Sequence, residues 1–350
     1  MATKPVDKEA YTFYDVRKAP FSIHGLYHPL EPGIFRRLPE EVAAAANPGV
    51  ADHARKPAGG RIRFSADCDR VAIHMHFANL NYTNEMISLL GAAGCDLYLD
   101  DPDGGMSRFY GVFRREKTPV EEIWSEVTFT GKKRRFMTID LPPFAVVDGF
   151  EVGLPHGVEP QPGLPYRPGD PIVYYGSSIT HGACASRPGN SYPNVVCQRT
   201  GRDYLNLGFS GSAKGEPAIV EYLASLPMSL FVLDYDHNAP DRDHLAATHA
   251  PIYRAVRATH PAIPIIMMTR PNFPLCREEN VYGRRDVVLE TFRAAREAGD
   301  KNVYFIDGST VITGPWDNMA LVDGTHPNDL GFALMADAVC AVLSRLPFYN

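Results

Sequence analysis

The sequence predicts an all-β region followed by an α/β domain built on a parallel sheet. Residues 1–165 contain short alternating runs bounded by Gly, Pro, Asp or Asn, a pattern typical of a β-sandwich. In residues 166–350, apolar runs alternate with helical segments, which is typical of a parallel sheet covered on both faces. The chain of 350 residues also exceeds the ~250–300 residues at which a single core usually stops growing. We therefore expect two domains, 1–165 and 166–350.

The first domain is expected to consist almost entirely of strands. His74 and His76 alternate with apolar residues, so they share one face of a strand, either a polar sheet face or a surface that lines a site. The basic cluster GKKRR at 131–135 is interpreted as a hairpin turn rather than a nucleic-acid patch. One helix is expected, PEEVAAAA at 39–46. The predicted strands are GRIRFSAD, RVAIHMHFAN, GCDLYLDD, SRFYGVFRR, WSEVTFTG, RRFMTIDLPP and FEVGLP.

A proline-rich linker at 153–171 separates the two patterns, because its six prolines prevent a regular element. The strands expected after it are PIVYYG, DYLNLGF, LFVLDYD, IPIIMMTR and NVYFIDG. The helices expected between and after them are SYPNVVCQRTG, EPAIVEYLASL, IYRAVRATH, RRDVVLETFRAAREAG and GFALMADAVCAVLSRL. This alternation predicts a doubly wound sheet.

Composition restricts the partners and the compartment. A net charge of -6 gives no reason to expect a nucleic-acid partner. No window reaches the ~18 apolar residues of a membrane helix, and the charged N-terminus lacks the apolar stretch of a signal peptide. None of the cysteines forms a CxxC motif, so we expect buried thiols in a reducing compartment, the cytoplasm. These cysteines are Cys68, Cys95, Cys184, Cys197, Cys276 and Cys340.

Polar residues with complementary chemistry lie near the predicted strand ends of the second domain. Function gathers beyond the carboxyl ends of the strands in such sheets. Ser178 follows the first strand, and a serine hydroxyl needs a base within hydrogen-bond reach. His326 can be that base, and Asp323, three residues earlier, can orient its imidazole. These residues predict acyl transfer through a serine nucleophile.

A serine nucleophile also needs donors for the negative oxygen that develops during attack. Ser178 offers its own backbone N–H at a helix start. Gly208 offers a backbone N–H that no side chain obstructs, and Asn238 offers a side-chain amide. All three follow predicted strands, so we expect them near one another.

Four segments, YYGSSIT, NLGFSGSA, DYDHN and VDGTHPNDLGF, resemble the signature blocks of the SGNH, or GDSL-type, hydrolases. GCDLYLD at 94–100 resembles the GxDLY motif of a β-sandwich that precedes the hydrolase domain in one branch. The resemblance implies a three-layer, flavodoxin-like hydrolase domain after a jelly-roll-like sandwich. It also implies Ser178 as nucleophile, Asp323 and His326 as the acid–base pair, and Gly208 and Asn238 as oxyanion donors.

The sequence departs from the family pattern in two blocks. The first usually reads Gly-Asp-Ser, whereas Ser177 stands in place of the acid here. The third usually reads Gly-x-Asn-Asp, whereas this chain reads Asp-His-Asn-Ala at 236–239. The missing acid is not the nucleophile, so the first change leaves Ser178 intact, and the second changes the frame around Asn238.

Several alternatives remain open at this point. Ser178 could simply cap a helix, or Ser177 could be the nucleophile in a shifted register. His181, His237 and Arg270 are candidate substrate contacts, although His181 could be structural and Arg270 could form an ion pair.

A cluster of Asp and His residues at 234–244, DYDHNAPDRDH, could in principle bind a divalent metal. The cluster lacks a recognised ligand spacing, and the serine set explains catalysis without a metal. We therefore expect neither a metal nor a cofactor.

The functional prediction is a serine esterase that hydrolyses a small acyl ester, with acetyl as the first choice, on a carbohydrate or small metabolite. The expected route is an acyl-enzyme on Ser178, with His326 as base oriented by Asp323. The first alternative is an acyltransferase with the same triad, and the second is a non-catalytic carbohydrate-binding protein. The expected partner is the small-molecule ester, and homo-oligomerisation is left open.

Overall fold

The computed structural model describes residues 6–79, 84–114, 121–271 and 281–346. Within it the chain forms two compact units. Unit 1 comprises the residues up to Arg37, Arg55–Arg167 and Ser186–Gly189; unit 2 comprises Leu38–Ala54, Pro168–Ala185 and the residues from Asn190 onward. Two short segments, 38–54 and 186–189, thus group with the unit that is more distant in sequence. Within the described residues, no helix is long and apolar enough to cross a membrane.

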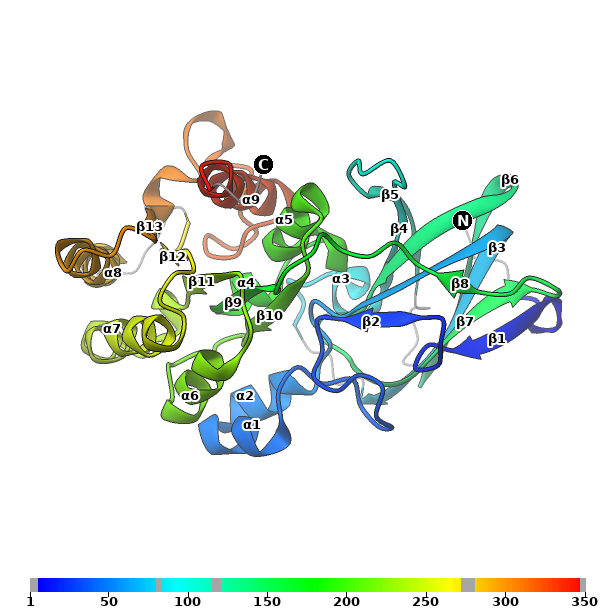
Figure 1. Ribbon diagram of the computed structural model, residues 1–350, viewed down its shortest axis with the longest axis horizontal. Coiled ribbons are helices and arrows are strands. Elements are labelled where there is room, and N and C mark those ends of the chain that lie inside the picture. The colour runs from blue at the N-terminus through cyan, green and yellow to red at the C-terminus, as the bar shows by residue number, and fades with distance from the viewer. Residues whose placement is uncertain (1–5, 80–83, 115–120, 272–280, 347–350) are drawn as a thin grey trace. The chain divides into compact units, whose positions relative to one another are not determined.

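Unit 1 is built on an eight-stranded antiparallel sheet, which confirms an all-β region (Figure 1). The strand order is β1-β7-β3-β6-β4-β5, and β2 and β8 pair with β3. The strands are β1 (Tyr11–Asp15), β2 (Ser22–His24), β3 (Arg61–Asn79), β4 (Cys95–Asp100), β5 (Arg108–Phe113), β6 (Glu122–Asp140), β7 (Val146–Pro155) and β8 (Gln161–Pro162). Two short helices, η1 (Lys8–Ala10) and α3 (Leu89–Ala93), accompany them.

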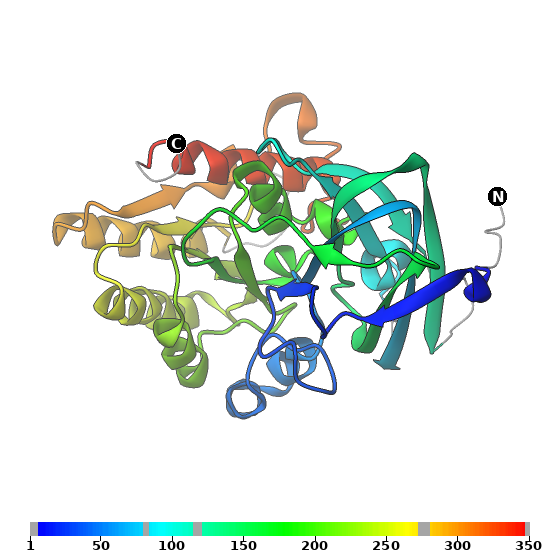
Figure 2. The ribbon, with the colours of Figure 1, turned by 45° about the vertical axis from the view of Figure 1, so that its right-hand side comes forward.

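Two pairs of predicted strands in unit 1 are in fact single long strands, β3 and β6 (Figure 2). Their pairing register shifts between Cys68 and Arg70, opposite the basic cluster in β6. Gly131 has a φ of 70° there, inside the strand. The hairpin-turn prediction for 131–135 was therefore wrong. A bulge of extra residues bends a strand without reversing it, so the same glycine and charge pattern arises within one continuous strand.

Unit 2 is built on a five-stranded parallel sheet in the order β10-β9-β11-β12-β13. In chain order this is 2-1-3-4-5, the order of flavodoxin-like folds. All five predicted strands are present, and most of their residues are buried, because both sheet faces carry helices. They are β9 (Ile172–Gly176), β10 (Tyr204–Gly208), β11 (Leu230–Asp234), β12 (Ile265–Met268) and β13 (Val303–Ile306).

Helices cover both faces of this sheet (Figure 1). One core cluster joins side chains of the sheet to α1, α2, α6, α7 and α8. On the other face α5 lies beside α9, and Tyr174 of the sheet meets Tyr192 of α5 edge-on. The α-helices are α1 (Glu40–Ala46), α2 (Pro48–Ala54), α4 (Ser178–His181), α5 (Tyr192–Thr200), α6 (Pro217–Ser225), α7 (Arg242–Thr259), α8 (Val281–Glu297) and α9 (Asp329–Leu343). The 3-10 turns are η2 (Pro188–Asn190), η3 (Asp236–Asn238), η5 (Gly308–Thr310) and η6 (Gly314–Trp316).

Candidate active site

The first signature segment forms a tight strand–turn–helix. Strand β9 ends at Gly176, and a Cβ there would lie only 2.3 Å from the backbone oxygen of Asp234, so the position requires glycine. Ser177 is the N-cap of α4, because its hydroxyl accepts a hydrogen bond from the Ile179 N–H at 3.1 Å. The capping role thus belongs to Ser177, and the hydroxyl of Ser178 is left for other chemistry.

Ser178, His326 and Asp323 form a continuous hydrogen-bonded chain. The Ser178 Oγ lies 2.9 Å from the His326 Nε2, and the His326 Nδ1 lies 2.7 Å from the Asp323 Oδ2. The second carboxylate oxygen of Asp323 accepts the backbone N–H groups of Thr325 and His326, at 2.9 and 2.7 Å. The turn 323–326 is therefore organised around one carboxylate, which fixes the ring that faces the serine.

The electrostatics of this chain suit a base. Burial alone would raise the pKa of Asp323, but hydrogen bonds from the backbone and ring of His326 and from the Thr325 amide outweigh it and lower the pKa. The carboxylate is therefore ionised at neutral pH. An ionised acceptor holds the proton of a neutral His326 on Nδ1, which leaves the Nε2 lone pair for the hydroxyl proton of Ser178.

The three candidate oxyanion donors differ in their present partners. No hydrogen bond found among the described residues uses the Ser178 N–H or the side-chain amide N–H groups of Asn238. The Asn238 Oδ1 accepts the Ala213 N–H at 3.4 Å, which turns the Nδ2 group the opposite way. By contrast, the Gly208 N–H donates to the Asn206 Oδ1 at 2.9 Å. Two of the three donors are thus available, and the third is already engaged.

Gly208 also has a packing reason to be glycine. A Cβ at this position would lie 2.3 Å from the backbone nitrogen of His181 in α4. The end of β10 therefore approaches the helix that begins at Ser178 more closely than any side chain would allow.

The candidate substrate contacts have structural partners of their own. The ring of His181 is buried and meets the ring of His53 from α2 edge-on, with centroids 5.2 Å apart. The Nδ1 of His237 lies 3.3 Å from an Asp236 carboxylate oxygen, and its side chain is 8% exposed. Burial lowers the pKa of His237 and the nearby Arg270 charge adds to this effect, whereas Asp236 opposes it, so the His237 ring is neutral at pH 7. The guanidinium of Arg270 donates to the turn that carries His326.

Sequence reasoning missed the role of Asp234, which ends the apolar strand β11. Its Oδ2 accepts hydrogen bonds from Thr180 of α4 at 3.0 Å and from Tyr192 of α5 at 3.1 Å. Burial raises the pKa of Asp234 to about 8, and the nearby Asp236 charge adds to this effect. An acidic residue that closes an otherwise apolar strand was the available signal. This carboxyl group ties α4, which carries Ser178, to the sheet.

A second missed residue is Arg284 of α8, which is buried. Its Nη1 donates to the backbone oxygens of Asp236 at 3.0 Å and Ala239 at 2.8 Å. These two carbonyl groups flank Asn238, so Arg284 holds the backbone of the segment that carries the candidate amide donor. Nothing in the local sequence pattern distinguishes Arg284 from the other basic residues of its helix.

The acidic and histidine cluster at 234–244 has local hydrogen-bonding roles. Asp241 caps α7 by accepting the His244 N–H at 2.7 Å, and the His244 Nε2 lies 2.7 Å from the Lys214 backbone oxygen. Across the described ranges, no group of three or more His, Cys, Asp or Glu side chains is arranged to hold a metal ion.

The GxDLY-like segment of unit 1 binds the short piece 186–189. The Asp96 Oδ2 accepts the Arg187 Nη1 at 2.9 Å and the Gly189 N–H at 2.6 Å. Elsewhere in unit 1, His74 lies 2.8 Å from carboxylate oxygens of both Glu122 and Glu151. The His74 side chain therefore belongs to a charged cluster on the sheet of unit 1.

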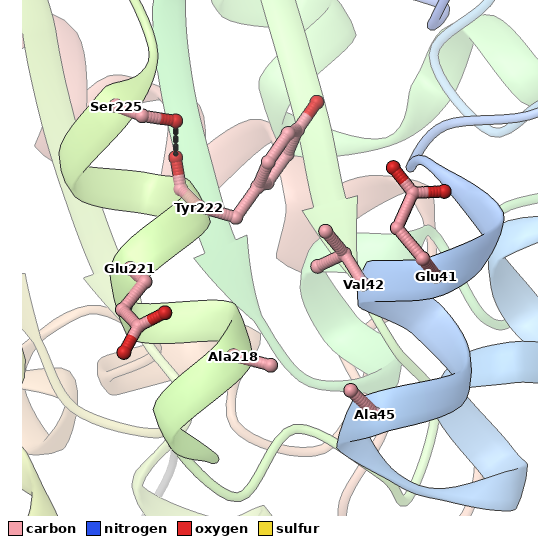
Figure 3. Close-up of a pocket in the computed structure, with 7 residues that line it drawn as sticks. All are labelled: Glu41, Val42, Ala45, Ala218, Glu221, Tyr222 and Ser225. Atoms are coloured by element: carbon pink, nitrogen blue, oxygen red, sulfur yellow. Dashed lines mark hydrogen bonds between the residues drawn. The ribbon is translucent and has the colours of Figure 1, made fainter.

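A shallow groove of about 340 Å³ lies between α1 and α6 of unit 2 (Figure 3). Its lining contains none of the predicted site residues. The lining residues are Glu41, Val42, Ala45, Ala218, Glu221, Tyr222 and Ser225.

Comparison with known proteins identifies the class and the family. Residues 169–344 match the model of the GDSL-like lipase/acylhydrolase family, and residues 11–159 match the model of an N-terminal domain of SGNH-hydrolase-type esterases. These matches, with the fold, define an enzyme of the carboxylic ester hydrolase class. The chain belongs to the GDSL-like lipase/acylhydrolase family. None of the curated proteins matches it detectably.

Solved structures show the same fold over nearly the whole chain. A protein described as a GDSL-like lipase, from Bacteroides ovatus, is 26% identical, with a TM-score of 0.84 over 96% of this chain and 97% of that chain. The salicylyl-acyltransferase SsfX3 of a tetracycline biosynthetic pathway is 20% identical, with a TM-score of 0.76 over 97% and 99% of the two chains. The acetyl xylan esterase Est2A from Butyrivibrio proteoclasticus is 12% identical, with a TM-score of 0.59 over 96% and 98%.

Proposed function

We propose that the protein is a serine esterase that hydrolyses a small acyl ester through an acyl-enzyme on Ser178. The observation that carries the proposal is the chain from the Ser178 Oγ to the His326 Nε2 and from its Nδ1 to Asp323, at 2.9 and 2.7 Å. A hydroxyl is a weak nucleophile, and these are the distances at which a base can take its proton.

In the proposed first step, the Ser178 Oγ attacks the ester carbonyl carbon while the His326 Nε2 accepts the hydroxyl proton. The intermediate collapses by breaking the bond to the alcohol oxygen, and His326 returns the proton to the leaving alcohol. In the second step, water attacks the acyl carbon with His326 again as base, the bond to the Ser178 Oγ breaks, and the serine recovers its proton. Asp323 stays ionised throughout and stabilises the imidazolium that forms in each step.

The proposed oxyanion donors are the Ser178 N–H and the Asn238 amide, with Gly208 as a third. Gly208 can contribute only if its N–H is shared with, or released from, the Asn206 oxygen that it meets at 2.9 Å. One well-placed donor is typically worth ~10²–10³ in kcat. Asn238 is held for this purpose by Ala213 on its own amide oxygen and by Arg284 on its backbone.

For the substrate, we propose an acetyl ester of a carbohydrate or another hydroxylated metabolite. The structural likeness to an acetyl xylan esterase supports acetyl, by analogy of fold alone. The likeness to a salicylyl-acyltransferase supports the alternative in which an alcohol replaces water in the second step. The second alternative, a non-catalytic carbohydrate-binding protein, is disfavoured by the assembled serine, histidine and aspartate.

The first test is turnover of p-nitrophenyl acetate by wild type and Ser178→Ala, with EDTA-treated wild type alongside. We expect turnover that EDTA leaves unchanged and that the alanine variant lacks. Adding a series of alcohols then separates the two enzymatic candidates, because a transferase releases p-nitrophenol faster and forms a new ester. Turnover that survives Ser178→Ala but is lost with EDTA refutes the serine mechanism.

We also propose a compartment, an architecture for unit 1 and a class of partner. Five cysteines within the described ranges are free thiols, which supports a reducing, cytoplasmic location; Cys276 lies outside those ranges. A jelly-roll-like sandwich is proposed for unit 1, supported by its long bulged strands. The small-molecule ester is the proposed partner, without a nucleic acid, a membrane or a cofactor, and homo-oligomers are left open.

A further inference from the structure

We infer that Arg270 is a positioning residue that holds the Asp323–His326 turn against the sheet and links it to the segment that carries Asn238. The inference rests on the proposed function, in which His326 is the base. Arg270 follows β12 at the carboxyl edge of the sheet, and its side chain is buried. One guanidinium nitrogen, Nη2, donates to the Gly324 backbone oxygen at 3.3 Å and to the Thr325 Oγ1 at 3.0 Å.

These two bonds connect the turn to the rest of unit 2, which the hydrogen bonds within the turn do not. Asp323 ties the turn to itself, through the Thr325 and His326 amides, and gives it an internal shape. Those bonds do not determine where the turn lies relative to Ser178, which follows β9. Arg270 follows β12 of the same sheet, so its contacts with the middle of the turn connect the base to the framework that also carries the nucleophile.

The backbone of Arg270 makes the second link. Its N–H donates to the Asp236 Oδ2 at 3.2 Å, and Asp236 lies two residues before Asn238 in η3. Burial alone would raise the pKa of Asp236, but the hydrogen bond with the His237 ring, together with the backbone N–H and the charge of Arg270, lowers it. Asp236 is therefore a buried carboxylate stabilised by Arg270, so one residue contacts both the base turn and the oxyanion segment.

The burial and the hydrogen bonds of Arg270 favour a positioning role over a direct contact with the substrate. The Nη2 of Arg270 is engaged by the turn, and the residue is only 5% exposed. Loss of this nitrogen should therefore displace His326 and lower kcat, with little effect on KM. A displacement of ~1 Å at reacting groups can cost ~10²-fold in rate. A residue that bound a substrate anion would raise KM instead.

The test uses Arg270→Lys in the 350-residue chain, because lysine keeps the charge beside Asp236 but places no atom at the position of Nη2 in the planar guanidinium. We expect kcat for p-nitrophenyl acetate to fall ~10–100-fold, with KM within ~3-fold of wild type. Thr325→Val removes one acceptor and should lower kcat by a smaller factor. In the double variant the two losses should be less than multiplicative, since both act on one contact.

The matched control is Arg257→Lys. The Arg257 guanidinium likewise donates to side-chain and backbone oxygens, of Asp300 at 2.9 Å and of His260 and Ile263, but none of its hydrogen bonds within the described residues reaches the 323–326 turn. This control should lose stability comparably and keep the wild-type kcat. If Arg270→Lys does not fold, the kcat and KM of Thr325→Val decide the question alone.

The inference is overturned if Arg270→Lys keeps the wild-type kcat, if it raises KM alone, or if the losses in the double variant multiply. An equal loss of kcat in the Arg257 control would also overturn it, because that would reflect general destabilisation. Ser178→Ala, measured in parallel, separates this failure from that of the proposed function. If Ser178→Ala is inactive and Arg270→Lys behaves as wild type, only the inference about Arg270 fails.

Discussion

Replacing Asp234 by asparagine tests how the sheet holds the helix that carries Ser178. The carboxyl group is buried and accepts two hydroxyl hydrogen bonds on Oδ2, while its Oδ1 has no partner among the described residues. Burial raises its pKa to about 8. Below that pH the group is protonated in the folded protein, and asparagine reproduces the neutral form without a titratable proton.

The sign of the effect follows from linkage. An unfolded aspartate has a pKa of ~3.9, so between pH ~4 and ~8 the unfolded chain is ionised here while the folded protein still holds the proton. The stability that this group contributes is complete below pH ~4 and is lost as the pH rises to ~8, at ~1.36 kcal/mol per pH unit. From pH 5 to 7, wild type should therefore lose ~3 kcal/mol relative to Asp234→Asn.

The assay is urea unfolding of both proteins at pH 5, 6 and 7. Trp316 lies in unit 2 and Trp124 in unit 1, so a Trp124→Phe background lets tryptophan fluorescence report unit 2 alone. We expect the stability difference between the two proteins to grow steadily with pH in favour of the asparagine variant. A difference that stays constant within ~0.5 kcal/mol, less than half of one pH unit's effect, would refute the reasoning.

Three further predictions follow from the site and the core. Asn238→Ala should lower kcat for p-nitrophenyl acetate ~10²–10³-fold with KM nearly unchanged, and a change confined to KM would contradict its oxyanion role. Asp323→Asn should lower kcat ~10³–10⁴-fold while circular dichroism stays native, because the amide holds the wrong imidazole tautomer; near-normal turnover would contradict this. A fragment of residues 166–350 should fail to form a native near-ultraviolet spectrum, because 38–54 supplies Leu38 and Val50 to the core of unit 2. Adding 38–54 through a flexible linker should restore the spectrum, and a well-folded fragment without it would contradict the packing argument.

The parallel sheet and the meeting of Ser178, Asp323 and His326 were predictable for the same physical reason. Parallel strands present their carboxyl ends at one edge, so polar residues that follow consecutive apolar strands meet there. Ser178 follows the end of an apolar strand, so its position at the carboxyl edge of the sheet could be predicted. The spacing of Asp323 and His326 within one turn predicted their hydrogen bond, because three residues suffice for a carboxylate to reach the ring.

What escaped prediction depends on side-chain rotamers and on contacts between segments far apart in sequence. Nothing local shows that Asn206 engages the Gly208 N–H, since that bond depends on the side-chain rotamer at the end of β10. The helices of 38–54 read as part of the N-terminal region, yet their apolar faces complete the core of unit 2. Arg270 read as a candidate anion contact because its partner turn lies more than fifty residues away.

The prediction also failed where a strand continued through residues that are typical of a turn. The glycine and the charges at 131–135 are typical of a turn, but a long strand absorbs them as a bulge. The additional helices α2 and α3 are too short for a periodic pattern to be visible.

The measurement that tests the central claim most directly is covalent labelling with a fluorophosphonate, followed by peptide mass analysis. Such a reagent bonds irreversibly to a serine that a neighbouring base activates. We predict one adduct on Ser178, complete loss of p-nitrophenyl acetate turnover, and no labelling of Ser178→Ala. An adduct on Ser177, or full turnover by an enzyme that remains unlabelled, would contradict the assignment of Ser178 as the nucleophile.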